Sequence, residues 1–272
     1  MDHDPSDQNK DLLPIPGFHG VREALDRGGR DIRIRALWLA QGKKSARMEE
    51  IAALARERGI PVAFKTRGDL DRMAPHVAHQ GIMAVAAPFS YRSLDEIAAG
   101  ALQDKEAALL VALDHITDEG NLSSLIRTAS FFGVHGMIIP KDRSAGISPA
   151  VLKRASGACA LVPATRVVNM ARTLALLDKQ GFWIIGTSPP VSISTDSWGA
   201  GGKTAPSIYR FDWNRDLVLV LGNEYRGMGQ AVEKQCHERV SIPSSGSMAS
   251  LNVSMAGAVI LSEISRQRHL DW

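Results

Sequence analysis

The chain has 272 residues, of which 44% are hydrophobic and 22% are charged, with a formal net charge of +3 and a pI near 8.9. This composition suits one large or two modest globular domains, and it permits an RNA partner without requiring one. No apolar run reaches the roughly 18 residues of a membrane helix, and the polar, acidic start of the chain lacks the features of a signal peptide. We therefore expect a cytoplasmic protein without a membrane partner, in which residues 1–14 form a disordered tail.

The cysteine and histidine content gives no indication of a metal site. The two cysteines, Cys159 and Cys236, form no C-x-x-C pair, and the eight histidines show no metal-ligand spacing. A zinc site is therefore not expected. Buried, reduced thiols are the interpretation that suits a cytoplasmic protein.

The first part of the chain predicts a small α/β domain, which we assign to residues 15–90. Apolar residues recur at helical spacing in several stretches, and Gly59 offers a C-terminal stop for one of them. We expect helices at 17–27, 46–59 and about 69–73, and strands at 34–40, 61–64 and 81–87. A helical or irregular linker is expected at residues 91–106.

The second part, residues 107–272, alternates apolar strands with amphipathic helices, which predicts an α/β domain with a parallel sheet. Continuous apolar runs are typical of strands buried on both faces, and we expect strands at 107–116, 136–140, 182–187, 216–222 and 239–243. Helices are expected at 121–133, 148–158, 170–181 and 251–268. Asn121 is the predicted N-cap of the first helix. Residues 188–210, rich in Ser, Gly and Pro, predict a long loop.

Polar residues follow three of these strands, and the carboxyl ends of parallel strands are where ligands bind in an open sheet. The three stretches are DHITDEGNLSSLIR (114–127), GNEYRGMG (222–229) and IPSSGSMASLNVS (242–254). The glycine fingerprints of phosphate and dinucleotide sites and the serine-hydrolase elbow are missing. A pocket built from Asn, Arg, Glu, Ser and Gly is therefore expected at this edge.

These stretches resemble, in chain order, the three motifs of the SpoU/TrmH family of RNA 2′-O-methyltransferases, which belongs to the SPOUT superfamily. The matching sequences are NLSSLIRTA, LVLVLGNEYRGM and IPSSGSMASLNVSMAGAVIL, within residues 107–268. GFHGVREAL and HQGIMAVAAP also resemble the opening helix and last strand of that family's substrate-binding domain. The combination is most similar to the bacterial enzymes that methylate a guanosine ribose in large-subunit rRNA.

The resemblance implies a C-terminal SPOUT domain with a trefoil knot, S-adenosylmethionine as the cofactor, RNA as the substrate and a homodimer formed through that domain. It places the catalytic positions at Asn121, Arg127, Glu224, Ser250 and Asn252. It places cofactor-binding positions at Gly222, Ile242 and Leu251, and Thr187 is added because it ends the neighbouring strand.

Arg127 has two readings. A guanidinium is a poor proton acceptor at neutral pH. The functional reading is therefore that Arg127 binds the adjacent phosphate and stabilises the developing alkoxide. The alternative is a salt bridge to Glu224 that braces two loops. The chain departs from the family at Glu119, where the motif usually has Pro, and at Tyr225, where it usually has Gly; both departures bear on the choice of substrate.

Three other functions remain open from the sequence. One is the same reaction on tRNA or another rRNA loop. The second is an RNA-binding protein that keeps the fold without catalysis, and the third is a nucleotide-cofactor oxidoreductase. Comparing the binding of S-adenosylmethionine with that of NAD would distinguish the oxidoreductase from a methyltransferase. Methyl incorporation into RNA would distinguish an active methyltransferase from the non-catalytic RNA-binding protein.

Overall fold

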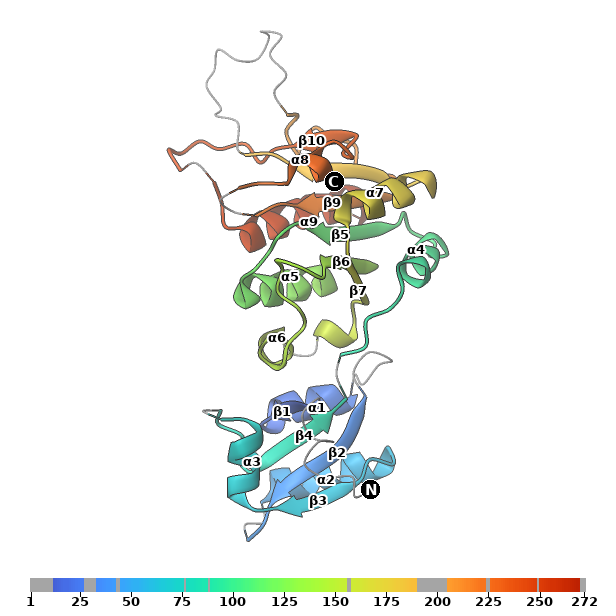
Figure 1. Ribbon diagram of the computed structural model, residues 1–272. Helices are drawn as coiled ribbons and strands as arrows, with labels where there is room; N and C mark the ends of the chain where they lie inside the picture. The colour runs from blue at the N-terminus through green and yellow to red at the C-terminus, as the bar shows by residue number, and fades with distance from the viewer. Residues whose placement is uncertain are drawn as a thin grey trace, which may run out of the picture. The chain divides into compact units, whose positions relative to one another are not determined.

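The computed structural model describes residues 12–26, 33–42, 45–75, 77–87, 89–155, 158–189, 205–223, 226–248 and 250–269 (Figure 1). These residues form two compact units. One contains the described residues up to Tyr91 together with Ile147–Leu161. The other contains Arg92–Gly146 and the described residues from Val162 onward.

The first unit is a four-stranded mixed sheet with helices packed on it. The strand order is β1 (Leu13–Pro16), β4 (Ile82–Ala86), β2 (Ile34–Ala40) and β3 (Val62–Lys65), and only the β2–β3 pair is parallel. Its helices are α1 (Phe18–Asp26), α2 (Ala46–Glu57), α3 (Arg67–Met73) and α6 (Pro149–Ala155), followed by the 3₁₀ turn η2 (Ala158–Ala160). The Ser45 hydroxyl caps α2, and a reciprocal Thr66–Asp69 capping box begins α3.

Two features of this unit differ from the sequence-based prediction. Leu13 and Pro14, which we expected in the tail, belong to β1, where Leu13 pairs with Ala86 in an antiparallel ladder. The segment 147–161, expected within the C-terminal domain, groups with the first unit, and its helix α6 packs against β1. The rest of the predicted tail, residues 1–11, lies outside the described residues.

As predicted, the second unit is built on a parallel sheet, and its described residues form six strands, one more than the five expected. Their order is β10 (Glu238–Val240), β8 (Trp183–Thr187), β9 (Leu217–Leu221), β5 (Leu109–Leu113), β6 (Gly136–Pro140) and β7 (Ala164–Val167). Every residue of β5, β6 and β9 is buried, which explains why these strands are continuous apolar runs.

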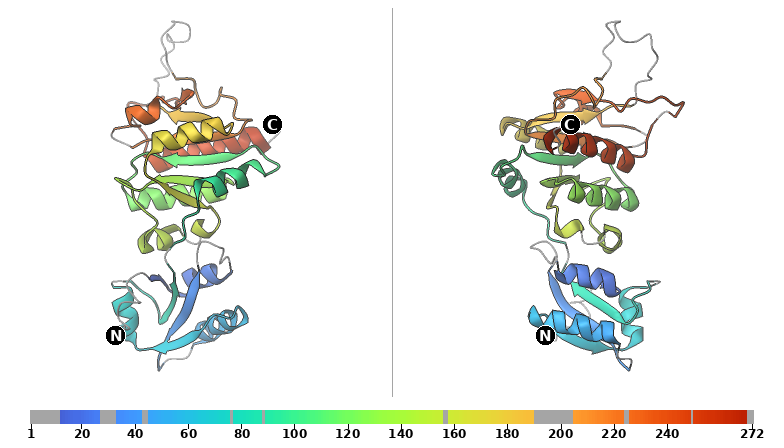
Figure 2. Two further views of the ribbon diagram at one scale, coloured as in Figure 1. Left: turned by 45° about the vertical axis from the view of Figure 1, so that its right-hand side comes forward. Right: turned by 180° about the vertical axis from the view of Figure 1, so that it is seen from behind.

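Helices cover both faces of this sheet (Figure 2). On one face lie α4 (Leu94–Leu102) and α7 (Met170–Lys179), whose apolar sides join the strands in one hydrophobic core. On the other face α5 (Glu119–Phe131) packs directly on α9 (Val253–His269). The short helix α8 (Gln230–Glu233) precedes β10. Gly257 permits the close approach of the two long helices, because a Cβ there would lie 2.7 Å from Leu125 Cδ2.

The start of α5 corrects one detail of the sequence analysis. Asp118, not Asn121, is the N-cap, and its Oδ1 accepts a hydrogen bond of 2.7 Å from the Asn121 N–H. The helix therefore begins at Glu119, and Asn121 lies in its first turn with its side chain available for other contacts. The expected trefoil knot stays a prediction. Across the described ranges, no helix is long and apolar enough to cross a membrane.

Candidate functional site

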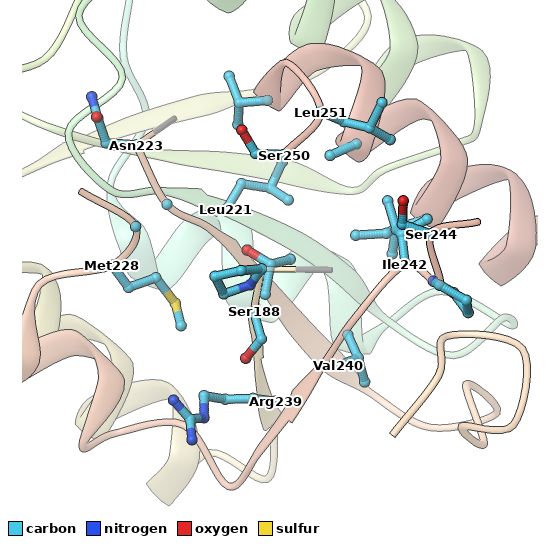
Figure 3. A pocket seen from close by; sticks show the side chains of 18 of the residues that line it. Ser188, Leu221, Asn223, Met228, Arg239, Val240, Ile242, Ser244, Ser250 and Leu251 are labelled. Atoms are coloured by element: carbon cyan, nitrogen blue, oxygen red, sulfur yellow. The ribbon is translucent and has the colours of Figure 1, made fainter. Parts of the chain in front are cut away.

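A cavity of about 780 Å³ opens at the carboxyl ends of the neighbouring strands β8, β9 and β10. Thr187 ends β8, Leu221 ends β9 and Val240 ends β10, and all three line the cavity. Because these strands are parallel, their carboxyl ends meet at one edge of the sheet, which is the usual ligand position in such folds. The segment before α9 closes the cavity with Ser250 and Leu251 (Figure 3).

All four predicted cofactor-binding residues line this cavity. They are Thr187, Gly222, Ile242 and Leu251, which come from four separate stretches of the chain. The Thr187 hydroxyl donates a hydrogen bond of 3.1 Å to the Val220 carbonyl, so it also ties β8 to β9. The structure thus brings the predicted set together, although its members are up to 64 positions apart in sequence.

Gly222 begins a tight loop that folds back on itself. Asn223 and Gly227 exchange two backbone hydrogen bonds, of 3.0 and 2.8 Å, and Gly227 has a φ of +65°. A Cβ at position 222 would lie 2.6 Å from Gly227 C and from Met228 N. Glycine is therefore required at 222 by the protein's own backbone. Gly246, which also lines the cavity, has open space among the described residues where a Cβ would stand.

The end of β5 holds this loop in place. The carboxylate of Asp114 is fully buried, and its Oδ2 accepts a hydrogen bond of 2.7 Å from the Gly229 N–H. Its Oδ1 lies 2.7 Å from Nδ1 of His115, and the His115 carbonyl accepts a hydrogen bond of 2.9 Å from Asn223 Nδ2. Sequence analysis did not single out Asp114 or Asn223. The available signal was a charged residue directly after an otherwise apolar strand.

Two of the predicted catalytic residues meet between α5 and α9. Asn252 Nδ2 donates a hydrogen bond of 3.0 Å to Asn121 Oδ1. The Asn252 Oδ1 in turn accepts hydrogen bonds from the backbone N–H of Ser254, at 2.9 Å, and from its hydroxyl, at 2.6 Å. Both asparagines are half-buried. This contact links the first and third motifs and fixes the starts of the two helices against each other.

The remaining predicted catalytic residues are less fully placed. Ser250 is exposed and lines the cavity, next to Leu251 (Figure 3). Arg127 lies on the exposed side of α5 and makes no hydrogen bond or ion pair with any residue that the structure describes. Glu224 and Tyr225 lie outside the described residues, so the pairing of Arg127 with Glu224 stays a prediction. Most of the predicted loop 188–210 lies outside them as well.

The cavity walls suit a nucleoside held largely by backbone groups. Among the described lining residues, the charged side chains are Arg226, Glu233 and Arg239, and the last two are hydrogen-bonded to each other. The other lining residues are the amide Asn223, two methionines, and small, aliphatic or hydroxyl-bearing residues. The volume lies within the range of ligand pockets, roughly 300 to 1,000 Å³. A neutral adenosine group fits such walls, because it needs apolar contact and backbone hydrogen-bond partners more than opposing charge.

Comparisons with known proteins agree with these motifs over both parts of the chain. The model of the SpoU rRNA Methylase family matches residues 108–262, and a model described as RNA 2′-O ribose methyltransferase substrate binding matches residues 14–92. The 23S rRNA (guanosine-2′-O-)-methyltransferase RlmB of Pseudomonas putida is 35% identical over 95% of this chain and 98% of that protein.

Further relatives support the same relationship. An uncharacterized tRNA/rRNA methyltransferase of Mycobacterium tuberculosis is 38% identical over 93% of this chain and 74% of its own length. Among solved structures, the SpoU methyltransferase AviRb of Streptomyces viridochromogenes superimposes with a TM-score of 0.73 at 25% identity, covering 98% of this chain and 93% of that one. The chain therefore belongs to the SpoU rRNA methylase family, whose activity is the transfer of a methyl group from S-adenosylmethionine to a ribose 2′-hydroxyl of RNA.

Proposed function

We propose that this enzyme methylates the ribose 2′-hydroxyl of a guanosine in large-subunit rRNA. The observation that carries the proposal is that a relative named for this reaction on 23S rRNA matches almost the whole chain, including both units. The cavity supports the chemistry, since all four predicted cofactor positions line it. Action on ribosomal RNA also fits the cytoplasmic location expected from the sequence.

S-adenosylmethionine, when bound, supplies a methyl group that its positive sulfonium has already activated. The residues of the chain then have to align the ribose hydroxyl with that methyl group and favour loss of the hydroxyl proton. Thr187, Gly222, Ile242 and Leu251 are the residues that we propose to hold the cofactor. Of the catalytic candidates, Ser250 stands at the same cavity.

The Asn121–Asn252 hydrogen bond connects the two segments that carry the other catalytic candidates. It joins the start of α5, the helix that carries Arg127, to the segment that carries Ser250. Side chains held in this way can orient a ribose without rearranging during the reaction. Polar groups that are preorganised in this sense lower the reaction barrier. We assign Asn121, Ser250 and Asn252 to binding and orienting the target nucleotide.

Arg127 is proposed to act on the phosphate and the developing alkoxide. An exposed guanidinium without an ion-pair partner among the described residues is free to bind an incoming phosphate, and its planar fork suits two phosphate oxygens. Glu224 is proposed to orient that guanidinium.

The test is methyl transfer with purified enzyme, labelled S-adenosylmethionine and unmethylated 23S rRNA. Digestion of the product to nucleosides should give 2′-O-methylguanosine as the labelled nucleoside. Asn252→Ala should reduce the rate strongly while the affinity for S-adenosylmethionine stays within a few-fold, because Asn252 is not among the described cavity-lining residues. Label in a base, in another nucleoside or only in tRNA would reject the proposed target.

We also propose that residues 15–90 select the RNA and that residues 107–272, apart from the segment 147–161 that groups with the first unit, carry the chemistry; the expected linker, residues 91–106, belongs to the second unit from Arg92 onward. The family model that covers residues 14–92 is described as substrate binding, which supports this division. Ultraviolet cross-linking of the full-length enzyme to 23S rRNA should attach RNA to peptides within residues 15–90. Cross-links restricted to the C-terminal part would reject this assignment.

A homodimer through the C-terminal domain is the third part of the proposal. Met248, Leu251 and Met255, around the start of α9, expose 77%, 44% and 61% of their surface. Large apolar side chains gathered in this way commonly mark a protein interface. Light scattering should give twice the 29.4 kDa of one chain, and a mass of one chain at micromolar concentration would reject the dimer.

A further inference from the structure

The loop that follows β6, residues 141–146, presents a pair of cations at the same edge of the sheet as the candidate active site. Lys141 and Arg143 are both exposed. Strand β6 is the neighbour of β5, whose carboxyl end leads into α5 and its residues Asn121 and Arg127 (Figure 1). The cofactor cavity lies at β8, β9 and β10, on the other side of β5. Along this edge of the sheet, the cofactor cavity comes first, the catalytic candidates after β5 come next, and the loop after β6 comes last.

Hydrogen bonds hold the loop at both ends. At its start, the Lys141 N–H donates to the Val167 carbonyl at 2.8 Å, and Arg166 Nη2 donates to the Lys141 carbonyl at 2.6 Å. At its end, the Ser144 hydroxyl and the Ala145 N–H both donate to the Ile116 carbonyl, at 3.0 and 2.7 Å. Ile116 lies just before α5, so the loop is tied directly to the segment that leads into the first motif.

Arg143 has an unfavourable backbone conformation. Its φ is +51°, in the left-handed region that non-glycine residues rarely adopt. Glycine would adopt this φ readily, yet the chain has arginine here. Strain of this kind persists where the surrounding structure imposes it, and it is concentrated at functional sites.

Neither Lys141 nor Arg143 forms a contact within the described residues that would give its charge a structural role. Over the described ranges, the Lys141 ammonium and the Arg143 guanidinium form no hydrogen bond or ion pair, whereas Arg166 Nη2 beside them donates to the Pro140 and Lys141 carbonyls. Asp142 stands between the two cations and lowers the charge of the loop without cancelling it. The exposed side chains are therefore presented on a rigid base rather than used for packing.

We propose that Lys141 and Arg143 bind the phosphate backbone of the substrate RNA beside the target nucleotide. The inference rests on the proposed function, since an RNA ribose delivered to the catalytic candidates must bring its neighbouring phosphates along this edge of the sheet. Guanidinium and ammonium groups bind phosphate oxygens through charge-assisted hydrogen bonds, without reading the base sequence. A rigid loop binds without the entropic cost of ordering a flexible one.

The test is RNA binding by a full-length Lys141→Ala/Arg143→Gly variant. Glycine at 143 removes the guanidinium and relieves the positive φ, so the variant should melt at or above the wild-type temperature. The control is Lys105→Ala/Lys179→Ala. Both of these lysines are exposed, and both lie where the chain enters a strand, Lys105 before β5 and Lys179 before β8, at the opposite edge of the sheet.

Binding is measured on an unmethylated 23S rRNA transcript over a range of salt concentrations. The Lys141→Ala/Arg143→Gly variant should bind at least about tenfold more weakly, as expected for the loss of a hydrogen bond to a charged group. The salt dependence should fall by about one unit of slope for each lost phosphate contact. Affinity for S-adenosylmethionine should match the wild type, and the control should keep wild-type RNA affinity.

The outcomes separate this inference from the proposed target. Equal RNA affinity and equal salt slope in the loop variant and the control would overturn the inference, even if the wild type methylates guanosine. A weaker, less salt-dependent loop variant together with a wild type that modifies another nucleotide would support the phosphate contact and reject the guanosine target. A loop variant that melts well below the wild type would show that the side chains are structural, which also overturns the inference.

Discussion

Substitution of Gly222 by alanine should destabilise the wall of the cofactor cavity, because the added methyl group would overlap the protein's own backbone. The added Cβ would stand 2.6 Å from Gly227 C and Met228 N, and 2.9 Å from Gly227 O, whereas ordinary contact begins at 3.4 Å. All three atoms belong to the backbone, so a side-chain rotation cannot relieve the overlap. The loop must open, and this breaks the hydrogen bonds that join Asn223 to Gly227.

Overpacking of this kind typically costs about 1 to 3 kcal/mol. If that cost falls on the cofactor-binding conformation, the affinity for S-adenosylmethionine should fall between about fivefold and 150-fold. In the free enzyme the opened loop has lost the hydrogen bonds between Asn223 and Gly227, so the melting temperature should also fall by several degrees. Titration calorimetry and thermal melting on the same samples measure both effects.

Gly246→Ala is the matched control, since Gly246 lines the same cavity and its Cβ would meet no atom of the described residues within 4 Å. This variant should keep the wild-type melting temperature, and any loss of affinity in it would report direct contact with the cofactor. The reasoning is refuted if Gly222→Ala melts with the wild type and binds S-adenosylmethionine normally. It is also refuted if both variants lose the same stability.

Three further predictions follow from single residues. Arg127→Ala should slow single-turnover methyl transfer about a hundredfold to a thousandfold, because the side chain is proposed to stabilise the transition state. The melting temperature and the cofactor affinity should stay near wild type, because the side chain is exposed. A folded variant with normal transfer would contradict this role. Asp114→Ala leaves the Gly229 N–H without its side-chain acceptor, so thermal melting should show a loss of about 1 to 3 kcal/mol and calorimetry a weaker cofactor affinity. Unchanged values would show that the loop needs no anchor. Burial raises the pKa of Cys159 to about 12 and that of the half-buried Cys236 to about 11, so at pH 8 both are protonated thiols and a thiol-reactive dye should label the native enzyme far more slowly than the denatured one. Rapid labelling of the buried Cys159 would contradict this expectation.

The sequence predicts the sheet well where burial leaves a strong pattern. Strands β5, β6 and β9 are buried on both faces, so each must be apolar at every position, and each was predicted. Strand β1 was missed because two of its four residues are proline, which indicates a loop when read in isolation. Strand β7 and helix α8 were missed because they are short, and β7 carries Thr and Arg among its apolar residues.

Some residues of the site were predicted from motifs in the sequence, whereas residues whose role depends on long-range contacts were missed. The cavity-lining residues Gly222, Ile242 and Leu251 were predicted from family motifs, because spacing alone does not reveal which strand ends are neighbours. Asp114 escaped prediction because its role depends on a hydrogen bond to a residue 115 positions away. The N-cap was misassigned because Asp118 and Asn121 are both good capping residues, and only the helix geometry distinguishes them.

The most direct test of the account is a map of 2′-O-methyl groups in the ribosomal RNA of cells with and without this gene. The account predicts that one guanosine of the large-subunit rRNA loses its ribose methyl group when the gene is deleted and regains it when the wild-type gene is restored. Restoration with Arg127→Ala should leave the site largely unmethylated. An unchanged map of the large-subunit rRNA after deletion, or a loss confined to tRNA, would contradict the proposed function.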